Sequence, residues 1–159
     1  MTKAPALRSL NWLLVSLLLL SGCAGMGKGN DPAVIDTTNT QRLYGRVFEL
    51  NTLVVNGSSV VMHVDGKMTL GFSPEGQAAG FGAANKFAGE YSFTPKGELK
   101  WSERGLRPVT KTGPPELLEK EKIYLDALRR TTRAVEGRHG LVLQTDDEST
   151  VLTFVEVGY

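Results

Sequence analysis

The only cysteine of this 159-residue sequence has the most distinctive chemical setting of any residue in it. Cys23 directly follows Leu20-Ser21-Gly22, one branched aliphatic residue and two small ones. A single thiol has no disulfide partner in its own chain, and it cannot supply the several thiolates of a structural zinc site. The chemistry that remains for Cys23 is covalent modification of its own sulfur, the alternative being an incidental free thiol.

The residues before Cys23 predict a secretory leader. Lys3 and Arg8 make its start positive without any acidic residue, and the stretch 12–20 is apolar except for Ser16. A positive start, a short apolar middle and small residues at the end are the three parts of a signal peptide. The apolar stretch is shorter than the ~20 residues that a membrane-spanning helix needs. We therefore predict that residues 1–22 are a signal peptide.

The run Leu20-Ser21-Gly22-Cys23 resembles the bacterial lipobox, at which the leader is cut before a cysteine that already carries diacylglycerol. The resemblance implies that Cys23 is the lipidated first residue of the mature protein. Two or more acyl chains, each contributing about 0.8 kcal/mol per buried methylene, anchor a protein stably. Because Ala24 rather than Asp follows the cysteine, we expect the periplasmic face of the outer membrane of a Gram-negative cell.

Catalytic or metal-binding chemistry has little support elsewhere. His63 and His139 are the only histidines and lie far apart beside predicted hairpin turns, so with Asp65 they lack the short spacing of metal ligands. No nucleophile elbow accompanies them. Asp146-Asp147 falls in a predicted tight turn, where solvated carboxylates are the usual case. We predict a non-enzymatic protein without metal or cofactor.

The pair Gly80-x-Gly82 could begin a dinucleotide-binding fingerprint, but Asn85 occupies the place of its third glycine and β-type residues follow. The charge balance also argues against nucleic acid as a partner. The whole chain has a formal net charge of +1, and loss of Lys3 and Arg8 with the leader lowers it to −1. A protein with that charge has no basic footprint for phosphates.

Three regions are predicted from composition. Residues 1–22 are the leader, residues 23–41 are a flexible tether rich in Gly, Asn and Thr, and residues 42–159 form one domain. The domain begins with short β-prone runs separated by turn signals such as Asn56-Gly57. The runs are 43–50, 52–55, 60–64, 67–72, 90–93, 141–143 and 151–155, and the further turns are 65–66, 73–76 and 94–97. Strands joined this closely must be mostly antiparallel.

One segment, about 115–131, has helical periodicity. Leu117, Leu118, Tyr124, Leu125 and Leu128 fall on one helical face, with acidic residues near the start and arginines near the end. A membrane-surface helix is disfavoured, because the polar face carries both charges. We predict an α+β fold, a strongly curved antiparallel sheet or open barrel closed by this amphipathic helix.

Three stretches resemble the META domain (HslJ-like) family. The run 43–50 is similar to its opening strand, where Phe48 replaces the usual Trp, and the segments 119–128, 135–137 and 141–143 are similar to its helix and final hairpins. The glycine-rich family segment matches at Gly80, Gly82, Asn85, Gly89 and Tyr91. Ala84 stands where many members have cysteine, and Gly113 or Pro114 stands near the second family cysteine, so the resemblance implies no such pair here.

The resemblance implies an envelope stress or antibiotic-tolerance lipoprotein that binds another envelope component. Two alternatives stay open: a lysozyme-inhibitor-like lipoprotein, or a pilotin-like carrier of lipid or another hydrophobic ligand. The glycines Gly80, Gly82 and Gly89 allow close backbone approach or positive φ. Asn85 has a structural role in our interpretation, holding an irregular turn rather than contacting a ligand. We expect a monomer.

Overall fold

The computed structural model describes residues 32–62, 67–137 and 140–158. The leader, Cys23, both histidines and the predicted turn Asp65-Gly66 lie outside these residues, so the predictions about them stay predictions. No helix within the described residues is long and apolar enough to cross a bilayer.

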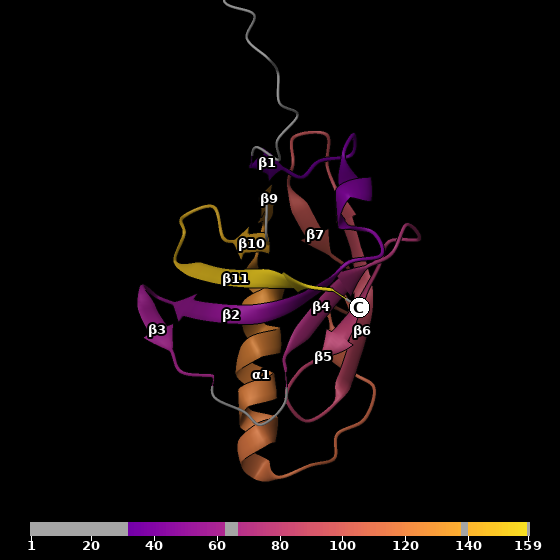
Figure 1. The fold of residues 1–159 in the computed structure, drawn as a ribbon. Helices are drawn as coiled ribbons and strands as arrows, with labels where there is room; N and C mark the ends of the chain where they lie inside the picture. The colour runs from indigo at the N-terminus through magenta and orange to yellow at the C-terminus, as the bar shows by residue number, and fades with distance from the viewer. Residues whose placement is uncertain (1–31, 63–66, 138–139, 159) are drawn as a thin grey trace, which may run out of the picture.

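The described chain forms one large antiparallel sheet with a helix packed on it (Figure 1). The strand order is β1-β9-β10-β11-β2-β4-β5-β6-β7, with β3 paired to β2 and β8 to β6. The elements are β1 (Ala33–Val34), η1 (Thr40–Leu43), β2 (Val47–Val55), β3 (Ser58–Val60), β4 (Thr69–Phe72), β5 (Gln77–Phe81), β6 (Lys86–Phe93), β7 (Leu99–Trp101), β8 (Arg107–Pro108), α1 (Pro115–Arg130), β9 (Arg133–Gly137), β10 (Gly140–Gln144) and β11 (Thr150–Val157). The predicted α+β fold is confirmed.

The predicted turns explain how the sheet folds back on itself. Asn56 and Gly57 have φ of 52° and 73°, the left-handed pair of a tight hairpin between β2 and β3. The Gly76 N–H donates to Ser73 O at 3.2 Å, and the Gly97 N–H donates to Thr94 O at 2.9 Å. Strand β5, which follows the first of these two turns, was not predicted, because its run of Gln, Ala and Gly has low β-propensity.

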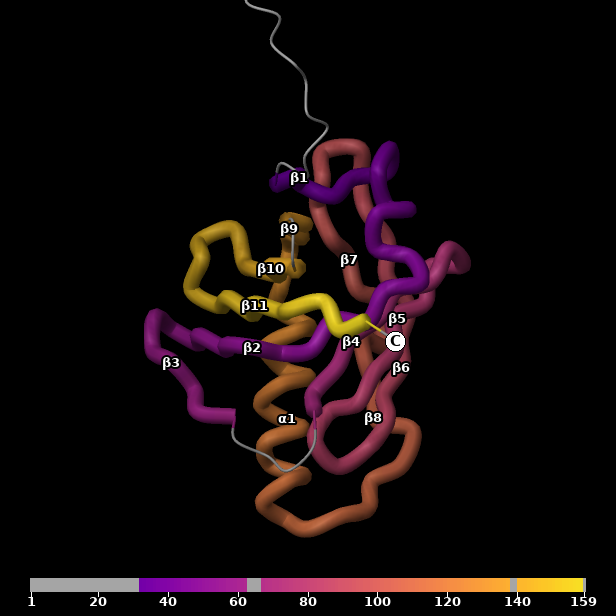
Figure 2. The backbone as a smooth tube through the Cα atoms, in the orientation of Figure 1, coloured from indigo at the N-terminus to yellow at the C-terminus, as the bar shows by residue number. Residues whose placement is uncertain are grey.

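The sheet curves strongly without closing into a barrel (Figure 2). Its two ends approach each other where β7 begins: the Leu99 N–H donates to Thr132 O at 2.7 Å, and Glu98 forms an isolated bridge with Arg133. A register shift between Thr153 and Phe154 in β11 adds local bending. The curved sheet thus leaves a concave side for the helix.

Helix α1 confirms the predicted helix and fills that concave side. Its residues Tyr124, Leu125 and Leu128 are buried. The Tyr124 ring contacts Phe87 of β6 at 5.9 Å and Phe154 of β11 at 6.5 Å between centroids. Such ring pairs add about 0.5–1.5 kcal/mol beyond area burial. The space between helix and sheet is therefore packed with side chains.

The predicted tether is too long at its C-terminal end. Ala33 and Val34 pair with β9 as strand β1, and Ile35 is 0% exposed. The turn after them is fixed by polar side chains, because Asp36 accepts hydrogen bonds from the Thr38 N–H at 2.7 Å and from the Thr38 hydroxyl at 2.6 Å. These bonds lower the pKa of the Asp36 carboxyl below its usual value. Composition alone gave the wrong prediction because Thr and Asn also build ordered turns.

An ion-pair cluster centred on the buried Glu136 holds the adjoining segment 42–46 to the sheet. Glu136 of β9 is 3% exposed and binds both Arg42 and Arg46, the latter at 2.8 Å. Arg46 also binds Glu156 at 2.7 Å and lies over the Phe48 ring at 4.9 Å. The charged groups of this cluster pair with one another. We therefore assign the cluster a structural role, which is to hold residues 42–46 against the sheet.

Candidate functional site

Two neighbouring features occupy the side of the molecule where α1 adjoins β8. The first is a buried hydrogen-bonded centre around Asn85 and Glu121, which we call the Asn85–Glu121 centre. The second is an open hollow lined by Pro108, Lys111, Leu118, Glu121, Lys122, Leu125 and Arg129, which we call the α1 groove. Glu121 belongs to both features, so the family motif and the groove are in direct contact.

Glu121 is a buried carboxylate on the face of α1 that meets the glycine-rich segment, and it is 3% exposed. Its Oε2 accepts the Asn85 N–H at 2.6 Å and the Ala84 N–H at 3.3 Å. Its Oε1 accepts the Asn85 side-chain amide at 3.1 Å. Three N–H donors compensate for the desolvation of this charge. Glu121 therefore joins α1 to the turn between β5 and β6.

Two glycines of the motif are required by close approach. A Cβ on Gly82 would lie 2.8 Å from Glu121 Cγ, so any side chain there would displace the carboxylate. A Cβ on Gly80 would lie 1.9 Å from Thr69 O, a backbone atom of the paired strand β4. Neither glycine has a positive φ, so of the two predicted reasons for glycine only close approach applies.

Asn85 also holds the segment that leads into the helix. Its Oδ1 accepts the Thr110 hydroxyl at 2.5 Å and the Thr112 N–H at 3.4 Å. Three residues after Thr110, a Cβ built on Gly113 would lie 3.1 Å from Ala84 Cβ. Ala84, where many family members have cysteine, therefore lies beside Gly113, one of the two residues that stand near the second family cysteine. Here the hydrogen bonds of Asn85 link the same two segments.

The other two motif residues have packing roles. A Cβ on Gly89 would lie 2.7 Å from Gly105 O, so this glycine lets the chain before β8 approach β6. The Tyr91 hydroxyl donates to Ser73 O at 2.9 Å, and its ring packs edge-on against Phe72. Burial raises the pKa of this hydroxyl above its usual range. Neither residue lines the α1 groove.

The α1 groove has a volume of about 310 Å³, at the lower end of the roughly 300–1,000 Å³ typical of ligand pockets. Leu118 contributes apolar surface from the helix and Pro108 contributes it from the opposite wall, while Leu125 lines the groove with only 1% of its surface exposed. Residues three, four or seven apart on a helix share one side, which explains why Leu118, Lys122 and Leu125 line it together. The groove combines an apolar floor with a charged rim.

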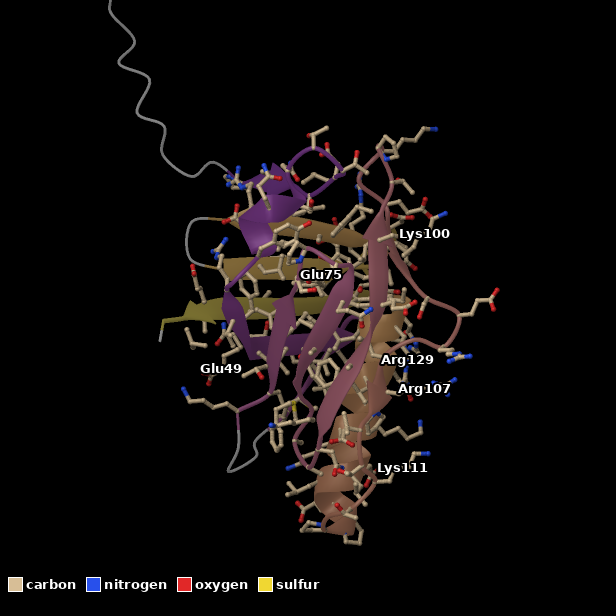
Figure 3. All side chains as sticks on the ribbon, turned by 90° about the vertical axis from the view of Figure 1, so that its right-hand side faces the viewer. Glu49, Glu75, Lys100, Arg107, Lys111 and Arg129 are labelled. Carbon is tan, nitrogen blue, oxygen red and sulfur yellow. The ribbon has the colours of Figure 1, made fainter. Side chains whose placement is uncertain are left out.

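The rim of the groove is predominantly basic. Asp126 binds Lys122 at 2.7 Å and Arg129 at 2.6 Å, and the hydrogen bond from Lys122 is the main cause of the lowered pKa of Asp126. Arg129 is held further by Leu106 O, which accepts its Nε–H at 3.0 Å. Lys111 is exposed and forms no ion pair with any residue the structure describes. Figure 3 shows Lys111, Arg107 and Arg129 along one side of the molecule.

A larger hollow of about 530 Å³ lies beside it, between β6 and the segment 102–107. Its walls are formed by Ala, Gly, Ser and Gln together with Glu90, Glu103, Arg104 and Arg107. It has two acidic and two basic side chains and no apolar side chain larger than Ala. We favour the smaller groove as the candidate site, because ligand pockets are mainly apolar with few polar groups.

Sequence reasoning identified Asn85 but missed its partner. The sequence pattern counts Glu121 only among the acidic residues near the start of the helix, although its spacing from Leu118, Leu125 and Leu128 puts it on the buried face. That spacing was the available signal. Within residues 32–62, 67–137 and 140–158, no group of three or more His, Cys, Asp or Glu could hold a metal ion.

Comparison with known proteins gives a family and a fold. Residues 41–158 match the model of the META domain. An NMR structure of a protein from Burkholderia xenovorans is similar to the chain, with 19% identity, 100% of each chain covered and a TM-score of 0.62. A second NMR structure has 22% identity, covers 72% of this chain and 92% of its own, and has a TM-score of 0.50. At such identities the structures support the fold alone. No curated protein matches the chain.

Proposed function

Because the chain belongs to the META domain family, we propose that it is a non-enzymatic binding protein of the bacterial envelope whose ligand site is the α1 groove. The observation that carries this proposal is the contact between the Asn85–Glu121 centre and that groove. The family motif fixes both walls: Glu121 lies in the helical wall, and Asn85 holds Thr110, which is next to Lys111 in the opposite wall. A site with preorganised walls loses less free energy on binding.

The packing of the interior counts against one form of the hydrophobic-ligand alternative, in which a carrier holds its ligand in a cavity between helix and sheet. The space between helix and sheet is filled, since Tyr124 is fully buried against Phe87 and Phe154. The apolar space that remains is at the edge of the helix, around Leu118 and Pro108. A carrier of this design would hold its ligand on the side of the domain rather than inside the sheet.

The lipid anchor is a second part of the proposal. Lipidation of Cys23 would tether the domain to the periplasmic face of the outer membrane, through the residues that precede β1. Labelled palmitate should be incorporated into the protein and lost in Cys23→Ser. Persistent labelling of the Cys23→Ser variant would refute the anchor. A role in envelope stress or antibiotic tolerance follows from the family resemblance, and growth of a deletion strain under envelope stress tests it.

Crosslinking in intact cells tests the binding role. A photoreactive amino acid at position 111 lies in the wall of the α1 groove, and the same amino acid at position 100 serves as the control. Lys100 is an exposed lysine on β7, well separated from the groove (Figure 3). We expect adducts from position 111 and few from position 100. Equal adduct formation at both positions, or none at position 111, would contradict a binding role for the groove.

A further inference from the structure

We infer that the α1 groove binds a single-chain anionic amphiphile, a molecule with one alkyl chain and one carboxylate or phosphate head. This inference rests on the proposed binding role of the groove and is independent of the Cys23 anchor. It names the chemical class of the ligand from three properties of the groove: its apolar floor, its excess of positive charge and its size.

The floor of the groove fits an alkyl chain. Leu118 is half-buried although it lies on the apolar face of α1, so part of its side chain faces the hollow rather than the core. Pro108 extends this surface across the groove, and Leu125 also lines it although only 1% of that residue is exposed. The alkyl stems of Lys111 and Lys122 can cover a bound chain while their ammonium groups stay in water.

The charge at the groove fits an anionic head. Three cations, Lys111, Lys122 and Arg129, line it. Two carboxylates oppose them: Asp126, which binds Lys122 and Arg129, and Glu121, whose oxygens already accept three hydrogen bonds. The sum leaves one positive charge in excess, and Lys111 is the cation without an ion-pair partner among the described residues. A carboxylate or phosphate beside Lys111 would balance it.

The size of the groove limits the ligand to one chain. A volume of about 310 Å³ lies at the small end of the roughly 300–1,000 Å³ range of ligand pockets. A cationic or neutral amphiphile of the same length would gain the apolar contacts without the pairing to Lys111. The groove should therefore select an anion over both at equal chain length.

Photoaffinity labelling of the full-length protein, as it is isolated from cells, tests this inference. The protein is reconstituted in phosphatidylcholine vesicles and irradiated with a diazirine derivative of dodecanoate. We expect adducts on peptides that contain Pro108–Lys111 or Leu118–Arg129. Dodecanoate and dodecyl phosphate should compete, whereas dodecyltrimethylammonium and dodecyl maltoside should not. Raising the salt concentration should weaken labelling, since an exposed head group is screened.

Matched variants separate a specific site from general surface labelling. Lys111→Gln should lower labelling about two- to fivefold, the range expected for one exposed ion pair, and Leu118→Gln should lower it further by removing apolar floor. Lys100→Gln makes the same charge change away from the groove and should leave labelling unchanged. Both groove positions are at least partly exposed, so these variants are expected to fold.

Three results would overturn the inference. They are equal competition by the cationic and neutral amphiphiles, labelling that is insensitive to both groove variants, and adducts that map elsewhere on the domain or need anionic lipid in the vesicles. The last would indicate a membrane-surface contact instead. If these results accompany protein adducts from position 111 in cells, the amphiphile is wrong and the binding role stands. If position 111 also gives no adducts in cells, the binding role itself is wrong.

Discussion

Removing the Glu121 carboxylate should destabilise the whole domain. Glu121→Ala leaves two well-placed donors, the Asn85 N–H at 2.6 Å and its side-chain amide at 3.1 Å, without an acceptor in a buried site. An unsatisfied buried donor costs about 1–3 kcal/mol. The relief of no longer burying a charge offsets part of that cost. We therefore expect Glu121→Ala to lower the free energy of unfolding by about 2–4 kcal/mol.

Glu121→Gln refines the same test. Glutamine keeps one oxygen acceptor, but its amide group must face one of the N–H donors, so we expect a loss of about 1–3 kcal/mol. Glu119→Gln is the matched control, because Glu119 is exposed on the same helix, and surface changes usually stay within about 0.5 kcal/mol. Urea unfolding followed by circular dichroism measures all three variants. If Glu121→Gln is as stable as Glu119→Gln, the hydrogen-bonded centre contributes nothing and our reasoning fails.

Three further predictions concern the residues around that centre. Gly80→Ala should lower the free energy of unfolding more than Gly82→Ala does in the same urea assay. The Cβ at position 80 would meet a backbone oxygen at 1.9 Å, whereas the Cβ at position 82 would meet a side chain at 2.8 Å. A smaller loss for Gly80→Ala than for Gly82→Ala would contradict these contacts. Ala84→Cys with Gly113→Cys should form a disulfide on oxidation, detected as loss of free thiols. Its stabilisation should be smaller than the roughly 3.6 kcal/mol expected for a loop of about 30 residues, because φ at Gly113 is +143°. The lowered pKa of Asp126 means that its stabilisation is present above about pH 4 and is lost as the pH falls through the folded-state pKa. Asp126→Asn should therefore lose less stability than wild type between pH 5 and 3, and it should bind the dodecanoate probe more tightly at pH 7. An unchanged acid dependence would show that the Lys122–Asp126 contact contributes little.

The fold was largely predictable because its elements depend on local signals. Asn56-Gly57 specifies a hairpin through two positive φ angles, and the helix begins at a proline and follows a regular apolar period. Strand β5 was missed for the opposite reason. Gln77–Phe81 has weak β-propensity and is a strand because β4 and β6 pair with both of its edges. Such pairing depends on distant residues and leaves little mark in a short run.

The N-terminal boundary was mispredicted because the sequence does not reveal its partner. Ile35 ends a run of only three apolar residues, Ala33-Val34-Ile35, which lies between Pro32 and Asp36 and is too short to predict a buried strand. It is buried because its N–H donates to Ala134 O at 2.9 Å and because Glu136, two residues further on, fixes Arg42 and Arg46. A contact between residues about a hundred positions apart carries no local signature.

The candidate site shows why a family motif can be recognised before its function is. Two glycines of the motif are required because a neighbouring group leaves no room for a side chain. That group is the adjacent strand at Gly80 and Glu121 at Gly82. The same glutamate turns one side toward Asn85 and lines the α1 groove with the other. Substitutions in the motif would therefore alter the groove even though Asn85 does not line it. A loss of binding in an Asn85 variant would not by itself make that residue a ligand contact, whereas Lys111 and Leu118 can be changed without disturbing the centre.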